Sequence, residues 1–192
     1  MGFRLRRAVA LPTLALAVAM AAAWLSTPAA DAAGKPCRLY GDTGPRKLSK
    51  QHARSAVLCL VNRRRSKHGL ATLKRNRKLQ QAAQRHSERM EGGNCLAHQC
   101  YGEASLDGRL RDVGYLVGGL SSWMYGENVG WGMKRRGTPR AMVNGWMSSP
   151  AHRAMVLNGQ FEEAGVGFAD GSPSNAHANA GVYTVDFGVR RR

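Results

Sequence analysis

The sequence predicts an α+β domain in which helices cover a sheet. Helical patterns fill most of the chain up to about residue 157, and two strand patterns follow near the C-terminus of the 192-residue chain. Helices that precede strands, without regular alternation, are typical of an α+β fold. Glycine and proline separate the elements, and the chain contains no internal repeat.

The first helix is expected from about Lys50 to a stop signal at Gly69. Basic residues gather near its C-terminal end, where they complement the helix dipole. Its apolar residues recur at spacings of three and four, which places them on one face. They are Ala53, Ala56, Val57, Leu60 and Val61.

A second helix is expected over residues 77–90, where a pair of glycines ends it. We interpret His86, which falls on the apolar face of this helix, as a core or supporting histidine. The stretch DGRLRDVGY (107–115) predicts a short third helix.

Two further helices are expected where proline marks a helix start. Thr138 precedes Pro139 and is a suitable N-cap. Pro150 disfavours helical conformation at Ser149, so the helix that begins at Pro139 is expected to end at Ser148. Ser149 is then expected to cap a new short helix.

Strand patterns span Ala164–Asp170 and Gly181–Val189, and apolar residues alternate in the second. The Gly-, Ser- and Asn-rich stretch between them predicts a hairpin loop. The stretch MYGENVGWG (124–132) is expected to form a strand or a tight buried turn.

Residues 1–32 have the layout of a secretory signal peptide. Three arginines near the N-terminus precede an apolar run over residues 8–25, and Ala-Asp-Ala at 30–32 matches an A-x-A cleavage site. An uncleaved membrane anchor is the alternative, since the apolar run approaches the length of a bilayer span. The chain is therefore expected to be secreted, extracellular or held in the cell envelope.

The remaining sequence fits one domain. Residues 33–48 are rich in Gly, Pro and Lys and predict an N-terminal arm, and residues 49–192 hold the domain itself.

The net charge of the chain limits the classes of binding partner that are expected. The chain has 29 Lys and Arg against 12 Asp and Glu, a formal net charge of +17, and removal of residues 1–32 would leave +15. Such a charge attracts anionic polymers and phospholipid headgroups, or serves solubility alone. No strand pattern interleaves aromatic with basic residues as RNA-binding sheets do, so no specific nucleic-acid partner is expected.

Four cysteines follow the predicted signal peptide, and an even number in an exported chain indicates disulfides. Of the three possible pairings we favour Cys37–Cys59, which would tie the arm to the first helix, and Cys95–Cys100, which would close a short loop. A zinc site formed by Cys95, His98 and Cys100 is the alternative, although its spacing matches no common zinc motif.

Several segments together resemble the CAP superfamily of cysteine-rich secretory proteins, antigen 5 and pathogenesis-related proteins, whose domain is also called SCP. The short bacterial members are the most similar. The segments that carry the resemblance are, in order, LVNRRRSKHGLATLKRNRKLQQAAQRHSERM, LAHQC, DGRLRDVGY, YGENVGWG, WMSSPAHRAMVLN, FEEAGVGF and VYTVDFG. The resemblance implies a three-layer α-β-α sandwich around a mainly antiparallel sheet.

The resemblance also implies a central cleft that gathers two histidines and acidic residues. The positions that match are His98, Glu127 and His152. Animal members often have a second glutamate three residues after the tryptophan of the WMSSPAHR segment, and here that position is Ser149. The resemblance therefore implies a cleft whose acidic set is incomplete.

Two imidazoles and a carboxylate suffice to hold a divalent ion such as zinc. His98, His152 and Glu127 are therefore the candidate metal ligands, and Glu127 is the candidate catalytic residue. The alternative is a hydrogen-bonded structural cluster of the same residues. No G-x-S-x-G motif occurs and the cysteines are expected to be oxidised, so nucleophilic catalysis by serine or cysteine is not expected.

Three functions follow from these observations. We favour an extracellular binding module without turnover, for lipid or anionic envelope material, which needs no cofactor. The alternative is a zinc-dependent hydrolase or peptidase that uses the cleft. The third is a scaffold whose surface contacts another protein. Trp123 and Trp131 are the aromatic residues expected to line a groove, and the sequence predicts no oligomeric state.

Overall fold

The structure, a computed structural model, describes residues 30–192. The predicted signal peptide over residues 1–32 therefore lies outside the described residues, except for its last three, which begin helix α1 (Ala30–Tyr40). No helix in the described part combines the length and the apolar character needed to cross a membrane.

The predicted helices and strands are present with small shifts at their ends. After α1 the elements are η1 (Pro45–Lys47), α2 (Lys50–Lys67), β1 (Lys74–Arg75), α3 (Arg77–Met90), α4 (Leu106–Asp112), β2 (Ser122–Met133), η2 (Lys134–Gly137), α5 (Pro139–Ser148), α6 (Pro150–Val156), β3 (Glu163–Asp170) and β4 (Ala180–Arg191). The segment expected to be a strand or a turn is part of β2.

The four strands form one sheet in the order β1-β3-β4-β2. The short β1 pairs with β3 in parallel, and the other two pairings are antiparallel. The sheet is therefore mainly antiparallel, as the resemblance implied. The long β2–β4 ladder places Glu127 directly opposite Asp186.

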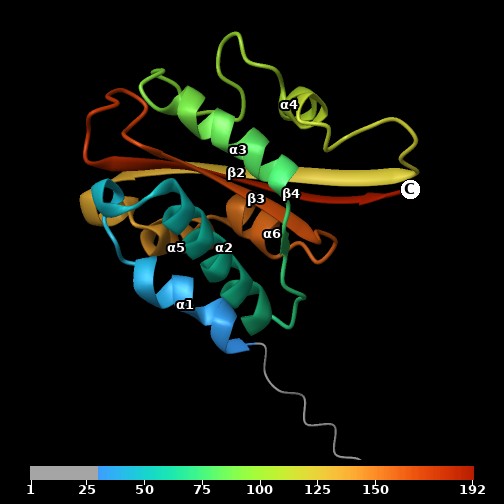
Figure 1. Cartoon of the computed structure of the whole chain (residues 1–192), viewed down its shortest axis with the longest axis horizontal. Coiled ribbons are helices and arrows are strands. Elements are labelled where there is room, and N and C mark those ends of the chain that lie inside the picture. The colour runs from blue at the N-terminus through green and yellow to red at the C-terminus, as the bar shows by residue number, and fades with distance from the viewer. Residues whose placement is uncertain (1–29) are drawn as a thin grey trace, which may run out of the picture.

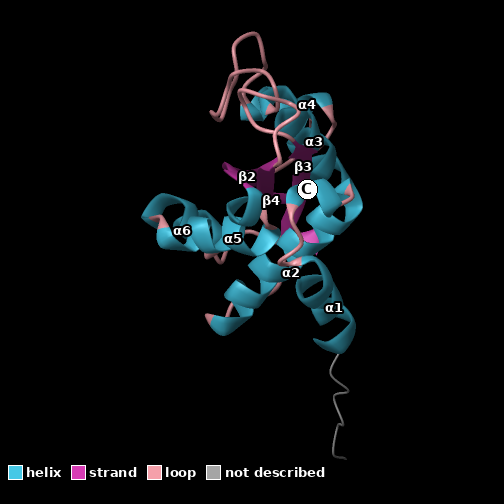
Figure 2. Cartoon of the chain, turned by 90° about the vertical axis from the view of Figure 1, so that its left-hand side faces the viewer, coloured by secondary structure: helices cyan, strands magenta, loops and turns pink. Residues whose placement is uncertain are grey.

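Helices cover both faces of this sheet. Helix α3 packs on one face with α4 beside it, whereas α2, α5 and α6 lie on the other, and α1 packs on the outside of α2 (Figure 1). Figure 2 shows the strands between the two helical layers. The molecule is thus the expected three-layer α-β-α sandwich.

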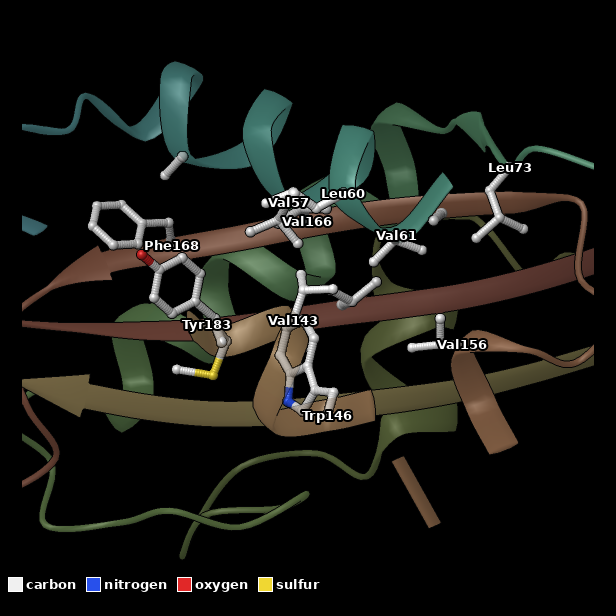
Figure 3. Close-up of a cluster of buried hydrophobic side chains, with 14 of the residues drawn as sticks. Val57, Leu60, Val61, Leu73, Val143, Trp146, Val156, Val166, Phe168 and Tyr183 are labelled. Carbon is white, nitrogen blue, oxygen red and sulfur yellow. The ribbon is translucent and has the colours of Figure 1, made fainter. Parts of the chain in front are cut away.

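The main hydrophobic core lies between the sheet and the α2/α5 layer (Figure 3). Val57 and Val61 from α2 and Val143 and Trp146 from α5 are almost fully buried there, against apolar side chains of β3 and β4 such as Tyr183. The predicted apolar stripe of the first helix supplies this packing. Each such side chain contributes about 1.5–3 kcal/mol through burial.

On the other face, α3 approaches the sheet through two glycines of β3. A Cβ atom at Gly165 would overlap the backbone of Leu79 and Gln80, and one at Gly167 would overlap the backbone of Ala83. Only the absence of a side chain permits a helix backbone to lie so close to a strand. This close packing fixes α3, which carries His86, against the sheet.

Of the two predicted N-cap residues, one caps its helix and the other does not. Thr138 caps α5 as expected, since its hydroxyl accepts a hydrogen bond from the Ala141 backbone N–H. Ser149 precedes α6, but its side chain makes no capping hydrogen bond. That expectation was wrong because the Ser149 hydroxyl is paired with His152 instead.

Both favoured disulfides are present. Cys37–Cys59 joins α1 to α2 and Cys95–Cys100 closes the loop after α3, with Cα–Cα distances of 5.5 and 5.9 Å. The segment 33–48, expected to be an arm, instead holds most of α1 and all of η1, and Cys37 is fully buried. Residues 30–192 contain no free cysteine, so the alternative zinc site of Cys95, His98 and Cys100 lacks its thiolates while the disulfide is intact.

Candidate functional site

Glu127 is the centre of a buried polar cluster at the β2 edge of the sheet. Its side chain is 1% exposed, and both carboxylate oxygens have partners. His98 donates from Nδ1 to Oε1 over 2.9 Å, and Arg109 donates from Nη2 to Oε2 over 2.9 Å. The family resemblance implied that Glu127 and His98 share one cleft, and the structure brings them into direct contact.

Arg109 connects this cluster to the loop that carries His98. The same Nη2 atom donates to the backbone oxygen of His98 over 2.9 Å. The guanidinium comes from the short helix α4, whose first turn is capped by Ser105. A buried cation on a rigid helix thus holds the His98 loop against Glu127.

These contacts shift the protonation of both partners. Burial alone would raise the pKa of Glu127, but the hydrogen bond from His98 and the charges of Arg109 and His86 outweigh it and lower that pKa. The hydrogen bond to Glu127 raises the pKa of His98, against the opposing effects of partial burial and of Arg109. The pair is therefore an ionised carboxylate beside a histidine that favours its charged form.

Asp186 is a second carboxyl group beside Glu127 that the sequence interpretation missed. It faces Glu127 across the β2–β4 ladder and is fully buried. Burial, together with the negative charge of Glu127, raises the pKa of Asp186 well above its usual range. Asp186 therefore favours its protonated form, whereas Glu127 favours its ionised form. Its position in a regular strand pattern, VYTVDFG, gave no signal beyond a polar residue in a buried strand.

His152 reaches the cluster from the opposite helical layer. Its Nδ1 lies 2.9 Å from the Ser149 hydroxyl, and its backbone oxygen accepts a 3.0 Å hydrogen bond from Asn128 on β2. Burial lowers the pKa of His152, and the nearby charge of His98 lowers it further. His152 is thus tied to β2 through its backbone, while its ring is held by Ser149.

His98, Glu127 and His152 were the candidate ligands of a metal ion, but the oxygens of Glu127 are already occupied. Glu127 already uses one oxygen for His98 and the other for Arg109. The part of the chain that the structure describes has one group of three potential ligand residues whose ligand atoms all lie within 4.8 Å of one another, and it consists of His86, Cys100 and Glu103. The trio of His98, Glu127 and His152 does not fit a preformed three-ligand site. Glu127 fits the role of a carboxylate that orients a histidine.

A groove outside this cluster has the features of a ligand site. It has a volume of about 980 Å³ and lies between α2, the β1 edge of the sheet and the start of α3. Apolar side chains of Leu58, Ala164 and Val166 form part of its wall. Four basic residues also line it, and no described lining residue is acidic. They are Arg54, Arg63, Lys67 and Arg75.

The tryptophans divide between core and surface. Trp146 is buried and donates its indole N–H to the backbone oxygen of Val129 over 3.0 Å. Trp123 and Trp131 on β2 are 47% and 39% exposed. Neither lines the groove beside α2, so the expectation that these two residues line a groove is not met there.

Comparison with known proteins agrees with this architecture. The model of the Cysteine-rich secretory protein family (CAP) matches residues 58–187. Two Bacillus subtilis (strain 168) proteins are similar in sequence: the uncharacterized protein YkwD, at 32% identity over 114 residues, and the uncharacterized membrane protein YlbC, at 33% identity over 111 residues. The matches cover 59% and 58% of this chain, but 41% and 30% of those relatives. The chain thus spans less than half the length of the curated relatives it matches.

Solved structures show the same fold. An extracellular protein containing a SCP domain from Bacillus anthracis matches 74% of this chain and 41% of its own length, with a TM-score of 0.59 and 26% identity. An outer surface protein from Borrelia burgdorferi matches 75% of this chain and 97% of its own, with a TM-score of 0.61. Its 16% identity supports a shared fold alone.

Proposed function

Because the chain belongs to the cysteine-rich secretory protein (CAP) family, we propose that it is an extracytoplasmic binding module for anionic amphiphiles. The ligand class is a molecule with one acyl chain and an anionic headgroup. The groove beside α2 binds it, and no reaction follows.

The observation that carries this proposal is the composition of the groove. An apolar wall favours an acyl chain through burial of its surface, and cations around that wall attract an anionic headgroup. Within the described residues, none of Arg63, Lys67 and Arg75 forms an ion pair. Their charges are therefore free to act on a ligand. The volume of about 980 Å³ lies within the range of ligand pockets.

The buried cluster supports binding without turnover. A carboxylate that acts as a general base must reach a substrate proton, but Glu127 is 1% exposed and paired at both oxygens. The His98 imidazole is 62% exposed and pairs with Glu127 through Nδ1, and it is the group on which the second candidate below depends. Asp186 is fully buried and favours its neutral form. The cluster therefore supports the edge of the sheet, and the extracytoplasmic setting agrees with two disulfides and with the extracellular and outer-surface proteins of the same fold.

A fluorescence titration of the full chain with dansylated undecanoic acid tests the proposal. The acid should bind, its uncharged methyl ester should bind more weakly, and added salt should weaken binding of the acid because charges are screened. The double variant Arg63→Glu/Arg75→Glu should bind the acid at least about tenfold more weakly, which corresponds to about 1.4 kcal/mol.

The matched control changes the same charge elsewhere. Arg135→Glu/Arg136→Glu reverses two exposed cations of η2 that do not line the groove. This variant should keep the wild-type affinity. Equal loss in both double variants would mean that net charge alone attracts the ligand, and the groove proposal would fail.

A zinc-dependent hydrolase or peptidase is the second candidate. The observation in its favour is that each imidazole is oriented through Nδ1, His98 by Glu127 and His152 by Ser149. Two Nε2 atoms are then left for an ion. Zinc incubation with both disulfides intact should give one bound ion per chain, lost in His98→Ala and in His152→Ala. A chain that stays free of zinc ends this candidate.

A further inference from the structure

A second cluster of metal-ligating side chains surrounds the Cys95–Cys100 disulfide. The ligand atoms of His86, Cys100 and Glu103 all lie within 4.8 Å of one another. His86 is fully buried, and Cys100 is 4% exposed. In the oxidised chain the Cys100 sulfur is bonded to Cys95 and is no metal ligand. With the disulfide intact the cluster therefore offers two ligands, His86 and Glu103, and reduction adds the cysteine sulfur.

The His86 ring is held as a metal-binding histidine is held. Its Nε2 lies 2.9 Å from the backbone oxygen of Ala97, which is an acceptor. Metal-ligating histidines commonly donate their second ring N–H to a backbone carbonyl, which fixes the ring orientation. The other ring nitrogen, Nδ1, faces the two oxygens of Glu103, each 2.9 Å away. A metal ion at this position would replace the proton on Nδ1.

The Glu103 carboxylate is positioned by its own loop. Its Oε2 accepts a 3.1 Å hydrogen bond from the Cys100 backbone N–H, and its side chain is 11% exposed. The Arg109 guanidinium lies 4.0 Å from Oε1. The cluster therefore keeps its shape through backbone and ionic contacts, and the sulfur of Cys100 lies within the same small volume.

We propose that reduction of the Cys95–Cys100 disulfide converts this cluster into a binding site for a thiophilic divalent cation such as Zn²⁺. The ligands are Cys100 Sγ, His86 Nδ1 and a Glu103 oxygen, and Cys95 is the fourth ligand. Thiolate, imidazole and carboxylate are the donors that Zn²⁺ accepts in four-coordinate sites. The ion would then replace the lost disulfide as the link that closes loop 95–100.

The reductant is a dithiol. Its thiolate attacks the sulfur of Cys95, which is more exposed than Cys100, and Cys100 leaves as a thiolate. The second thiol of the reductant attacks the mixed disulfide, releases Cys95 and completes the oxidation of the dithiol by two electrons. Zn²⁺ then accepts electron pairs from both sulfurs and from His86 Nδ1, and the displaced protons pass to solvent.

The Cys95→Ser variant tests the site without a reductant, so that Cys37–Cys59 stays intact. Co²⁺ is the probe, since thiolate ligation gives a sulfur-to-cobalt charge-transfer band in the near ultraviolet. We expect one Co²⁺ per chain with this band in Cys95→Ser, bound at least about tenfold more tightly than by the oxidised wild type. The phosphine-reduced wild type should give a more intense band, because Cys95 adds a second thiolate.

The double variant Cys95→Ser/Cys100→Ser is the matched control, because it also lacks the disulfide but has no thiolate in the loop. It should show no charge-transfer band, and Glu103→Gln in the Cys95→Ser background should weaken Co²⁺ binding about tenfold or more. His98→Gln in that background should leave the band unchanged. Absence of the band from Cys95→Ser, or its loss in the His98→Gln variant alone, would overturn the proposal.

Discussion

Glu127 and Asp186 face each other across the β2–β4 ladder with both carboxyl groups buried, and their pKa values are shifted in opposite directions. Glu127 has the cationic partners His98 and Arg109, which lower its pKa, whereas burial and the neighbouring charge of Glu127 raise the pKa of Asp186. Two carboxylates this close do not both ionise readily. At this edge of the sheet, Glu127 therefore favours its charged form and Asp186 favours its protonated form.

The Asp186→Asn variant should become more stable relative to the wild type as pH rises. An unfolded aspartate has a pKa of about 3.9, and the folded pKa of Asp186 is raised. Wild-type stability from this group is therefore present below about pH 3.9 and is lost as pH rises towards the folded pKa. The asparagine variant has no ionisable group at this position and therefore lacks this loss.

Urea unfolding of both proteins between about pH 4 and pH 7 measures the effect. The difference in the free energy of unfolding should grow with pH, by at most about 1.4 kcal/mol per pH unit. A difference that stays constant over this range would mean that Asp186 ionises in the folded protein as it does in the unfolded chain.

The two cluster histidines should titrate on opposite sides of the ordinary histidine value of about 6.5. The pKa of His98 is raised by Glu127, and the pKa of His152 is lowered by burial. NMR of the imidazole protons against pH checks the order. Glu127→Gln removes the charge that favours protonated His98, so the pKa of His98 should fall in that variant.

The His98 titration also has a consequence for stability. Because its folded pKa is raised, its contribution is fully present below about pH 6.5 and is lost as pH rises through the folded value. His52 is a useful reference for the spectra, since it lies on α2 and stacks on Tyr40, away from this cluster. If His98 titrates below His152, the proposed charge arrangement is wrong.

Substitution of Thr138 and of Ser149 by alanine distinguishes a side chain that caps a helix from one that does not. Thr138→Ala removes the hydroxyl that accepts from Ala141 N–H and should cost about 1 kcal/mol. Ser149→Ala removes no capping bond from α6, but it removes the hydroxyl partner of His152 Nδ1 and should cost about 0.5–1.5 kcal/mol for that reason. In a His152→Ala background, where this hydrogen bond is absent, Ser149→Ala should change stability by less than about 0.5 kcal/mol. Thermal unfolding measures each variant. A loss in the His152→Ala background equal to that of Thr138→Ala would contradict the assigned helix starts.

Two glycine-to-alanine substitutions test the close packing of α3. Gly165→Ala forces a methyl group into the α3 backbone and should destabilise the protein by about 1–3 kcal/mol or more. Gly145→Ala in α5 meets nothing within 4 Å and should stabilise it by about 0.5–1 kcal/mol, because alanine favours a helix. Chemical unfolding of both variants distinguishes them by sign, and stabilisation by Gly165→Ala would contradict the packing.

The features that followed local rules were predictable from the sequence. Periodic apolar residues gave α2 and α3, and the Thr-Pro pair gave the start of α5. The pairing of four cysteines followed from loop position. The resemblance to the family named His98 and Glu127, which are in contact.

Features that depend on tertiary contacts were not predictable. Arg65 belongs to a basic run at the end of α2 that was expected to complement the helix dipole, but it is fully buried. Its guanidinium donates to four backbone oxygens, among them those of Val156 and Phe161. Asp186 and Gly165 likewise owe their roles to partners distant in sequence, which neither spacing nor composition reveals.

The position of the bound amphiphile tests the central claim most directly. Two-dimensional amide NMR spectra of the full chain, recorded during titration with dansylated undecanoic acid, report which residues the ligand approaches. We predict that the largest shifts occur at groove residues such as Leu58, Asn62 and Val166. Shifts confined to the exposed tryptophans of β2 or to the His98 loop, with none in the groove, would contradict the account.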